Sequence, residues 1–284
     1  MKIIKFLSAG LIILIVLSCE KSVELDFPKA PSRIIVDGWI EQGRPPKVLL
    51  TRSLPYFSEV DSSSFRNLLI SKAKVSVTVD GTTEILTLHH NDKYFPPFIY
   101  QGFQIEGEVG KTYTLNVEIN KKTITAKTRI PEPPTIDSLC TITHPEKDTL
   151  KQIMVQFTDD PNSADFYRMF SRIQGLDQYY KPSYASVFSD DAFNGSTVSF
   201  PLFKGYTTQE NKEDLYFSDD DTVYVKFCTI SRNAYQFWKN YQSEQMNSLN
   251  PFASSAQEIE GNVNGDGKGV WTGYGVEYDK IIIP

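Results

Sequence analysis

Hydrophobic and polar residues alternate along much of the chain from residue 33 onward, which is the pattern of half-buried β-strands. Val75, Val77 and Val79 alternate with polar neighbours, and Asp80-Gly81 then provides the two residues that a tight hairpin turn favours. Six more segments of this kind precede residue 131, so that the predicted strands cover residues 33–40, 47–52, 72–79, 83–88, 98–105, 112–119 and 123–130. About seven short strands in about a hundred residues predict an immunoglobulin-like β-sandwich over residues 32–131.

A proline-rich segment, Pro131-Glu132-Pro133-Pro134, follows these strands. Proline cannot donate to a central strand ladder and stiffens a linker, so the segment predicts a domain boundary. Residues 135–284 are then expected to form a second β-rich module, with strands at 153–157, 166–173, 184–188, 197–203, 222–230 and 270–278. Its one helix is predicted near residues 233–246, where aromatic residues follow helical spacing and favour packing on a sheet. The predicted fold class is therefore mainly all-β.

The first residues have a different pattern, with Lys2 and Lys5 before an uninterrupted apolar run from Phe6 to Leu17. This pattern predicts an export signal over residues 1–18, and the run is short for a membrane-spanning helix. Val16-Leu17-Ser18-Cys19 resembles the lipobox of bacterial lipoproteins, in which the signal is cut before the cysteine and acyl chains such as palmitate are attached to it. Several acyl chains would anchor the protein firmly at Cys19. An ordinary secretory signal is the alternative, and residues 19–31 are expected to be an acidic, proline-containing tether.

Net charge and cysteine content narrow the range of partners. Removing residues 1–18 takes away two of the 29 basic residues and none of the 35 acidic ones, which lowers the formal net charge from −6 to −8. Such a balance disfavours nucleic acid as a partner, because binding nucleic acid needs clustered Lys and Arg. Cys140 and Cys228 are the other cysteines. Export would permit a disulfide between them, and two separate buried thiols are the alternative.

Several segments together resemble one protein family. They are Gly110–Val117, Ala126–Pro131, Asp191–Gly195, Thr222–Phe227 with Tyr235–Trp238, and Asn250–Phe252 with Asn262–Val270. The chain is similar in these segments to Bacteroidota lipoproteins grouped as "domain of unknown function 4249". The resemblance implies an outer-membrane lipoprotein, often encoded beside a TonB-dependent transporter. It provides no catalytic residues.

Acidic and amide clusters are the candidate metal ligands. Asn262-Val-Asn-Gly-Asp-Gly267 matches the start of a calcium loop, but the twelfth position is Gly273 and lacks the bidentate glutamate, which favours a glycine turn. The pairs Asp159-Asp160 and Asp190-Asp191 and the run Asp219–Asp221 are typical of solvated turns, although two of them could converge on a hard cation. We expect no metal and no cofactor.

Tyr179, Tyr180 and Tyr184 flank a proline in a predicted loop, and tyrosine is enriched at recognition surfaces. They are the candidate partner or ligand surface, with ordinary packing as the alternative. The sequence therefore predicts a non-catalytic accessory or binding component of a TonB-dependent nutrient-uptake system, with an outer-membrane barrel as its partner. A surface adhesin or matrix-binding lipoprotein is the second hypothesis. A polymer-degrading hydrolase is the third, because paired carboxylates need only be close in space. The sequence does not decide whether the lipid-anchored protein faces the cell surface or the periplasm.

Overall fold

Strands make up 59% of the residues that the computed structural model describes, and α3 (Arg232–Asn247) is the one helix among them. The described residues are 32–53, 68–94, 96–205, 215–247 and 259–284. The mainly-β prediction is confirmed, and so is the helix predicted near residues 233–246. The predicted export signal, Cys19 and the tether lie outside the described residues.

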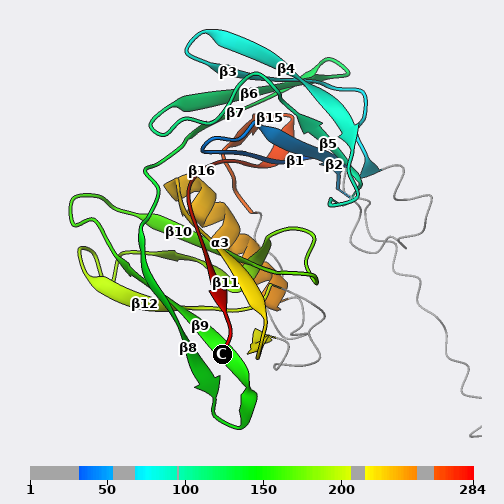
Figure 1. Ribbon diagram of the computed structural model, residues 1–284. Helices are drawn as coiled ribbons and strands as arrows, with labels where there is room; N and C mark the ends of the chain where they lie inside the picture. The colour runs from blue at the N-terminus through cyan, green and yellow to red at the C-terminus, as the bar shows by residue number, and fades with distance from the viewer. Residues whose placement is uncertain (1–31, 54–67, 95, 206–214, 248–258) are drawn as a thin grey trace, which may run out of the picture. The chain divides into compact units, whose positions relative to one another are not determined.

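The strands form two sheets (Figure 1). The larger is mixed and has 12 strands in the order β11-β10-β14-β16-β1-β2-β5-β4-β3-β6-β7-β15. The smaller has four strands, in which β9 pairs with β8 as well as with β12 and β13. The first half of the chain provides β1 (Ile34–Glu41), β2 (Lys47–Arg52), β3 (Lys74–Val79), β4 (Thr82–His90), β5 (Phe98–Gln101), β6 (Thr112–Ile119), β7 (Lys122–Arg129) and β8 (Ile136–His144). The second half provides β9 (Lys147–Thr158), β10 (Phe166–Ile173), β11 (Lys181–Ser189), β12 (Thr197–Leu202), β13 (Phe217–Ser218), β14 (Thr222–Ile230), β15 (Val263–Gly265) and β16 (Gly267–Ile282).

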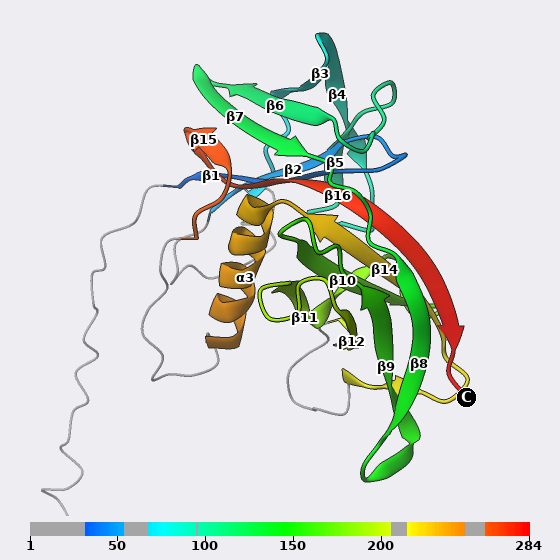
Figure 2. The ribbon, with the colours of Figure 1, turned by 90° about the vertical axis from the view of Figure 1, so that its left-hand side faces the viewer.

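The long strand β16 joins the N-terminal and C-terminal strands into one sheet. It pairs in parallel with β1, with Ile34 opposite Gly267, and antiparallel with β14, with Thr222 opposite Ile282. Figure 2 shows β16 in red, running from the side of β1 to the side of β14. Strands from both sides of residues 131–134 therefore share a sheet. Independent folding of residues 32–131 stays a prediction.

The proline-rich segment lies directly against β16. A Cβ atom on Gly273 would lie 2.4 Å from the Arg129 carbonyl oxygen, and one on Gly275 would lie 2.3 Å from that of Pro131. Both distances are far too short, so glycine at these positions permits the two backbones to approach. The Gly273 amide also donates a hydrogen bond of 2.8 Å to the Thr128 hydroxyl.

Three hydrophobic clusters hold the described residues together. The first contains mainly aliphatic side chains of β1–β7 and the fully buried Trp271 of β16, whose indole N–H donates to the Tyr113 carbonyl at 3.0 Å. The second lies between the two sheets and is aromatic, with Phe157 and Phe227 4.8 Å apart and Phe188 stacked on Phe200 at 4.1 Å. The third lies beneath α3.

Helix α3 packs on β10, β11 and β16, as its aromatic stripe predicts. The Ser231 hydroxyl accepts a hydrogen bond from the Ala234 amide at 3.4 Å, which is the expected role of an N-cap serine. Ala234 is fully buried, and Trp238 donates to Thr272 of β16 at 3.4 Å. Side chains on a strand alternate between its two faces. On β16, Trp271 therefore enters the first cluster, whereas Tyr274 lies on the opposite face with α3.

Candidate functional site

Charged side chains lie on the face of the large sheet that α3 partly covers. Glu41 of β1 and Lys226 of β14 form a buried ion pair, with exposed fractions of 9% and 6%. The Tyr278 hydroxyl donates to the second Glu41 carboxylate oxygen at 3.0 Å, and Arg44 lies 3.5 Å from the same oxygen. Strand β16 lies between β1 and β14, so the ion pair reaches across β16 and links the two strands on either side of it.

The electrostatics of this pair depend on its partners. Burial alone would raise the pKa of Glu41, but the charge of Lys226 and hydrogen bonds from Lys226 and Tyr278 hold that pKa below its ordinary value. Burial and the negative charge of Glu41 raise the pKa of Tyr278, so its hydroxyl stays protonated and remains a donor. Each charge is compensated, which suits a binding or structural role better than proton transfer.

Aromatic rings accompany the basic residues on the same face. The Arg168 guanidinium lies 3.5 Å from the Trp238 ring centre, and Lys226 lies 5.0 Å from that of Tyr274. Arg172 stacks on Tyr224 at 4.1 Å. Cations over aromatic faces are favourable when water is partly excluded. This face therefore combines charge and aromatic area, the two features that recognition surfaces use.

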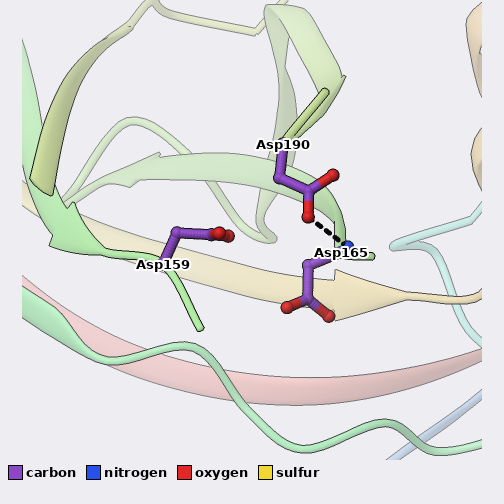
Figure 3. Close-up of side chains that lie close together, drawn as sticks. All are labelled: Asp159, Asp165 and Asp190. Carbon is purple, nitrogen blue, oxygen red and sulfur yellow. Dashed lines mark hydrogen bonds between the residues drawn. The ribbon is translucent and has the colours of Figure 1, made fainter. Parts of the chain in front are cut away.

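A second group of charges is formed by three carboxylates (Figure 3). Asp159 follows β9, Asp165 precedes β10 and Asp190 follows β11, and one oxygen of each lies within 4.8 Å of the others. Asp159 and Asp190 are buried, with exposed fractions of 2% and 3%. The sequence left open that two acidic clusters could converge, and the structure brings Asp159 and Asp190 together with Asp165. Asp219–Asp221 instead form the turn before β14, with Asp220 at φ 67°.

Hydrogen bonds show what these carboxylates do in the fold. Asp159 accepts from the Tyr167 hydroxyl and from the Gly195 amide at 2.8 Å, and Asp190 accepts from the Asp165 amide at 2.8 Å. Burial, followed by the neighbouring negative charges, raises the pKa of Asp165, although a bond from Ser163 opposes the shift. Carboxylate oxygens are the ligands of hard cations such as Ca²⁺, but these contacts also tie neighbouring loops to one another and to β10.

The three predicted recognition tyrosines lie in different surroundings. Tyr179 is 47% exposed in the turn before β11. Tyr180 is half-buried, with its ring 5.7 Å from that of Tyr278 and the Arg172 guanidinium 5.5 Å away. Tyr184 belongs to β11, and its ring lies 6.3 Å from that of Phe203. Their role in recognition stays a prediction.

The structure contains both Cys140 and Cys228 as free thiols, so the disulfide that the sequence permitted is absent between them. Cys140 is exposed on β8 in the smaller sheet, whereas Cys228 is buried on β14 in the larger one. Burial raises the pKa of Cys228 to about 12, which keeps its thiol protonated and unreactive.

The amide-rich loop before β16 has a structural role. The Asn262 side chain accepts from the Trp271 amide at 2.8 Å and donates to the carbonyls of Lys127 and Trp271 at 2.9 and 2.8 Å. Gly265 has a φ of +91°, as a glycine turn requires. These contacts join β7 to β16 and agree with the turn interpretation of residues 262–267.

Sequence reasoning missed the residues of the charged face. Asp37 and Glu41 lie in the alternating pattern of β1, where polar positions suggest solvent exposure. Arg168 lies in the otherwise apolar segment Phe166–Ile173. A charged residue within such a buried strand is the signal that could have been used, because buried charges need partners.

Comparison with known families identifies the chain. Residues 20–277 match the family described as "Domain of unknown function (DUF4249)", and the chain belongs to this family. No curated protein matches it in sequence. Among the described residues, no helix is long and apolar enough to cross a membrane.

Proposed function

We propose that this chain, a member of the DUF4249 family, is an outer-membrane lipoprotein. In this proposal it acts as a non-catalytic accessory or binding component of a TonB-dependent nutrient-uptake system. Lipids on Cys19 would hold it to the membrane, and an outer-membrane barrel would be its partner. The observation that carries the proposal is the basic and apolar N-terminal pattern that ends in Val16-Leu17-Ser18-Cys19, ahead of a body made of β-sheets. The charged and aromatic face beside α3 supports a binding role.

The anchoring test replaces Cys19 with alanine. The variant is expected to leave the membrane fraction and to accumulate as a slower-migrating, unprocessed form. Ser18→Ala is the matched control, because small residues are tolerated before a lipidated cysteine, and it should behave as wild type. Unchanged retention and processing of the Cys19→Ala protein would contradict the lipid anchor.

The partner test is co-purification of the tagged full chain from detergent-solubilised envelopes. A large TonB-dependent barrel should be recovered in near-stoichiometric amount. Recovery of a host or polymer ligand without a barrel would favour the adhesin hypothesis instead. Turnover of a glycan or peptide by the pure protein, lost when one or two carboxylates are replaced, would establish a hydrolase.

We also propose that residues 32–131 have an immunoglobulin-like arrangement that folds by itself. Its support is the series of antiparallel pairs β4–β3, β3–β6 and β6–β7 around an aliphatic core. A fragment of residues 32–131 should melt cooperatively. The fragment lacks Trp271, which fills that core, so a second fragment with residues 259–284 fused to it measures what β16 adds. If only the fused fragment melts cooperatively, the folded unit includes β16 and does not end at residue 131.

A further inference from the structure

An acidic and a basic side chain lie near each other on the α3 face without a direct bond. Asp37 of β1 is partly exposed, and its carboxylate forms no hydrogen bond or ion pair with any residue that the structure describes. Arg168 of β10 is 5% exposed and donates to the Tyr274 hydroxyl at 2.8 Å, while its Nε atom has no partner among the described residues. Burial raises the pKa of Asp37, and the nearby positive charge of Arg168 opposes that shift.

This carboxylate combines two properties that seldom occur together. It is surrounded closely enough for burial to affect its pKa, yet solvent still reaches it. A polar group that has lost much of its water normally finds a hydrogen-bond donor within the protein. Asp37 finds none in the described parts of the chain, so it is positioned to accept a hydrogen bond from a bound molecule.

Asp37 and Trp39 lie on the same face of β1, and Trp39 packs in the third hydrophobic cluster together with Trp238 of α3. The rings of Trp39 and Tyr94 lie 5.7 Å apart, and those of Trp238 and Tyr241 lie 5.8 Å apart. Burial raises the pKa values of Tyr94 and Tyr241, and the negative charge of Asp37 adds to both shifts, behind that of Glu41 in the case of Tyr94. We call Asp37, Trp39, Tyr94, Arg168, Trp238 and Tyr241 the Asp37 patch.

Within the described residues, the two tyrosine hydroxyl groups of the patch donate to no acceptor. The Tyr94 hydroxyl accepts from Lys47 at 3.5 Å, and the Tyr241 hydroxyl accepts from Gln245 at 3.2 Å. In both contacts the tyrosine is the acceptor, so its own proton remains available. The patch therefore offers one strong acceptor, two hydroxyl groups and four ring faces.

The charges of the patch favour a neutral ligand. A cation would be attracted by Asp37 but repelled by Arg168, and an anion would meet the reverse arrangement. A saccharide carries no charge, its hydroxyl groups both donate and accept, and its C–H groups can lie on the electron-rich face of an aromatic ring. Small-molecule sites commonly combine such aromatic area with a few polar groups that fix orientation.

We propose that the Asp37 patch binds a neutral saccharide, with a sugar ring against the aromatic side chains and a sugar hydroxyl donating to the Asp37 carboxylate. The Arg168 guanidinium lies over the Trp238 ring and helps to hold that ring in place. The inference deepens the binding role proposed above and rests on it. Its test uses the purified protein without a barrel, so that the two proposals can fail separately.

The probes are the neutral hexasaccharides of glucose (β-1,4 and α-1,4), mannose and xylose, titrated into the full chain by calorimetry. The detergent must lack a sugar head group, because a maltoside or glucoside would compete. At least one hexasaccharide should bind with a dissociation constant between about 10 μM and 1 mM, the range expected for a small exposed site. Galacturonic acid hexamer and triglycine, as charged and zwitterionic probes, should bind at least tenfold more weakly.

Two variants assign the binding to the patch. Asp37→Ala removes the acceptor and Tyr241→Ala removes a 40% exposed ring, and each should weaken binding at least tenfold. Tyr216→Ala, which removes a partly buried tyrosine ring packed 4.6 Å from the His144 ring, away from the α3 face, is the matched control and should change affinity less than twofold. Thermal melts show that each variant is folded, and Tyr241→Ala decides the matter if Asp37→Ala does not fold.

Three results would overturn the inference. The first is that no neutral hexasaccharide binds up to about 10 mM. The second is preferential binding of the acidic hexamer or triglycine, which would assign a charged ligand. The third is saccharide binding that Tyr241→Ala leaves unchanged. A barrel recovered by co-purification alongside any of these results would leave the uptake role standing without the saccharide site.

Discussion

Buried acidic residues occur in two regions, and the two regions balance their charge in opposite ways. On the α3 face, Glu41 is neutralised by Lys226 and receives a hydrogen bond from Tyr278. At the ends of β9 and β11, Asp159 and Asp190 form no ion pair with a basic residue in the described parts of the chain and accept from amide and hydroxyl donors instead. The stability of the first region therefore depends on a specific cation, and that of the second on the geometry of two loops.

This comparison predicts a large effect when one member of the ion pair is removed. Lys226→Met leaves Glu41 buried and unpaired, which should lower the free energy of unfolding by about 3–5 kcal/mol. In a chain of this size the melting temperature should fall by about 10 °C. Urea denaturation of the purified variant measures the change.

Two further variants isolate the role of burial. Lys74→Met breaks the exposed Lys74–Glu118 pair, 3.2 Å long, and should cost less than about 1 kcal/mol. The double variant Glu41→Leu with Lys226→Met removes both buried charges and should recover at least half of the lost stability. Equal losses for Lys226→Met and Lys74→Met would contradict the importance of the buried pair.

The rate at which a thiol reagent modifies Cys228 also tests the importance of the buried Glu41–Lys226 pair. Cys228 lies two residues from Lys226 on β14 and is fully buried, with its pKa raised to about 12 by burial. Its modification by a thiol reagent must await opening of this face. Lys226→Met should therefore speed modification of Cys228 at least about tenfold, while the exposed Cys140 reacts at an unchanged rate. Rapid modification of Cys228 in the wild-type protein would contradict its burial.

Replacing an acid of the second region should have a smaller effect. Asp159→Ala leaves the Tyr167 hydroxyl and the Gly195 amide without their acceptor, but it also relieves repulsion with Asp165 and Asp190. We expect a net loss of about 2 kcal/mol, as for unsatisfied buried groups. The neighbouring exposed Asp160 accepts only within its own turn, so Asp160→Ala should cost less than about 1 kcal/mol. Equal losses of unfolding free energy for Asp159→Ala and Asp160→Ala would contradict a special role for the buried Asp159.

The comparison also explains which features the sequence could reveal. Residues 47–52, 112–119, 166–173 and 222–230 are strands with the bounds that their patterns predict, because each has at least one face in a core. Ile136–His144 was missed, since β8 lies at an edge and its burial does not alternate regularly. The pairing of β1 with β16 joins segments more than 200 residues apart, and alternation within either strand carries no information about that partner.

The candidate sites were harder to predict for the same reason. Lys226 lies within the alternating strand 222–230, but its partner Glu41 is on β1 and only the sheet order brings them together. Asp159 and Asp190 were recognised as acidic clusters, yet Asp165 was not, because it stands alone in the sequence. The three candidate recognition tyrosines are close together along the chain, but Tyr184 belongs to a strand and Tyr179 to a turn.

The smallest predicted effect concerns Asp165, where the sign depends on pH. Its pKa is raised by burial and by neighbouring carboxylates, so the folded state binds the proton more tightly than the unfolded state does. Stability is therefore lost as pH rises from the unfolded pKa through the folded one. Asp165→Asn removes this penalty and should stabilise the protein by about 0.5–1 kcal/mol at pH 7, a typical size for a partly solvated charge interaction.

The stabilisation should shrink as the pH falls toward about 4, because the raised pKa leaves more of the wild-type carboxyl protonated and a protonated carboxyl resembles the amide. Asp191→Asn is the matched control: Asp191 also accepts a hydroxyl from the residue two positions before it, but it does not contribute to the shifted pKa of Asp165. Thermal melts of wild type and both variants from pH 4 to pH 8 measure the difference. A contradicting result would be a wild-type melting temperature that rises by several degrees in millimolar Ca²⁺, with no such rise in Asp165→Asn. That result would show that the three carboxylates bind a cation, and that their mutual repulsion destabilises the protein only while the cation is absent.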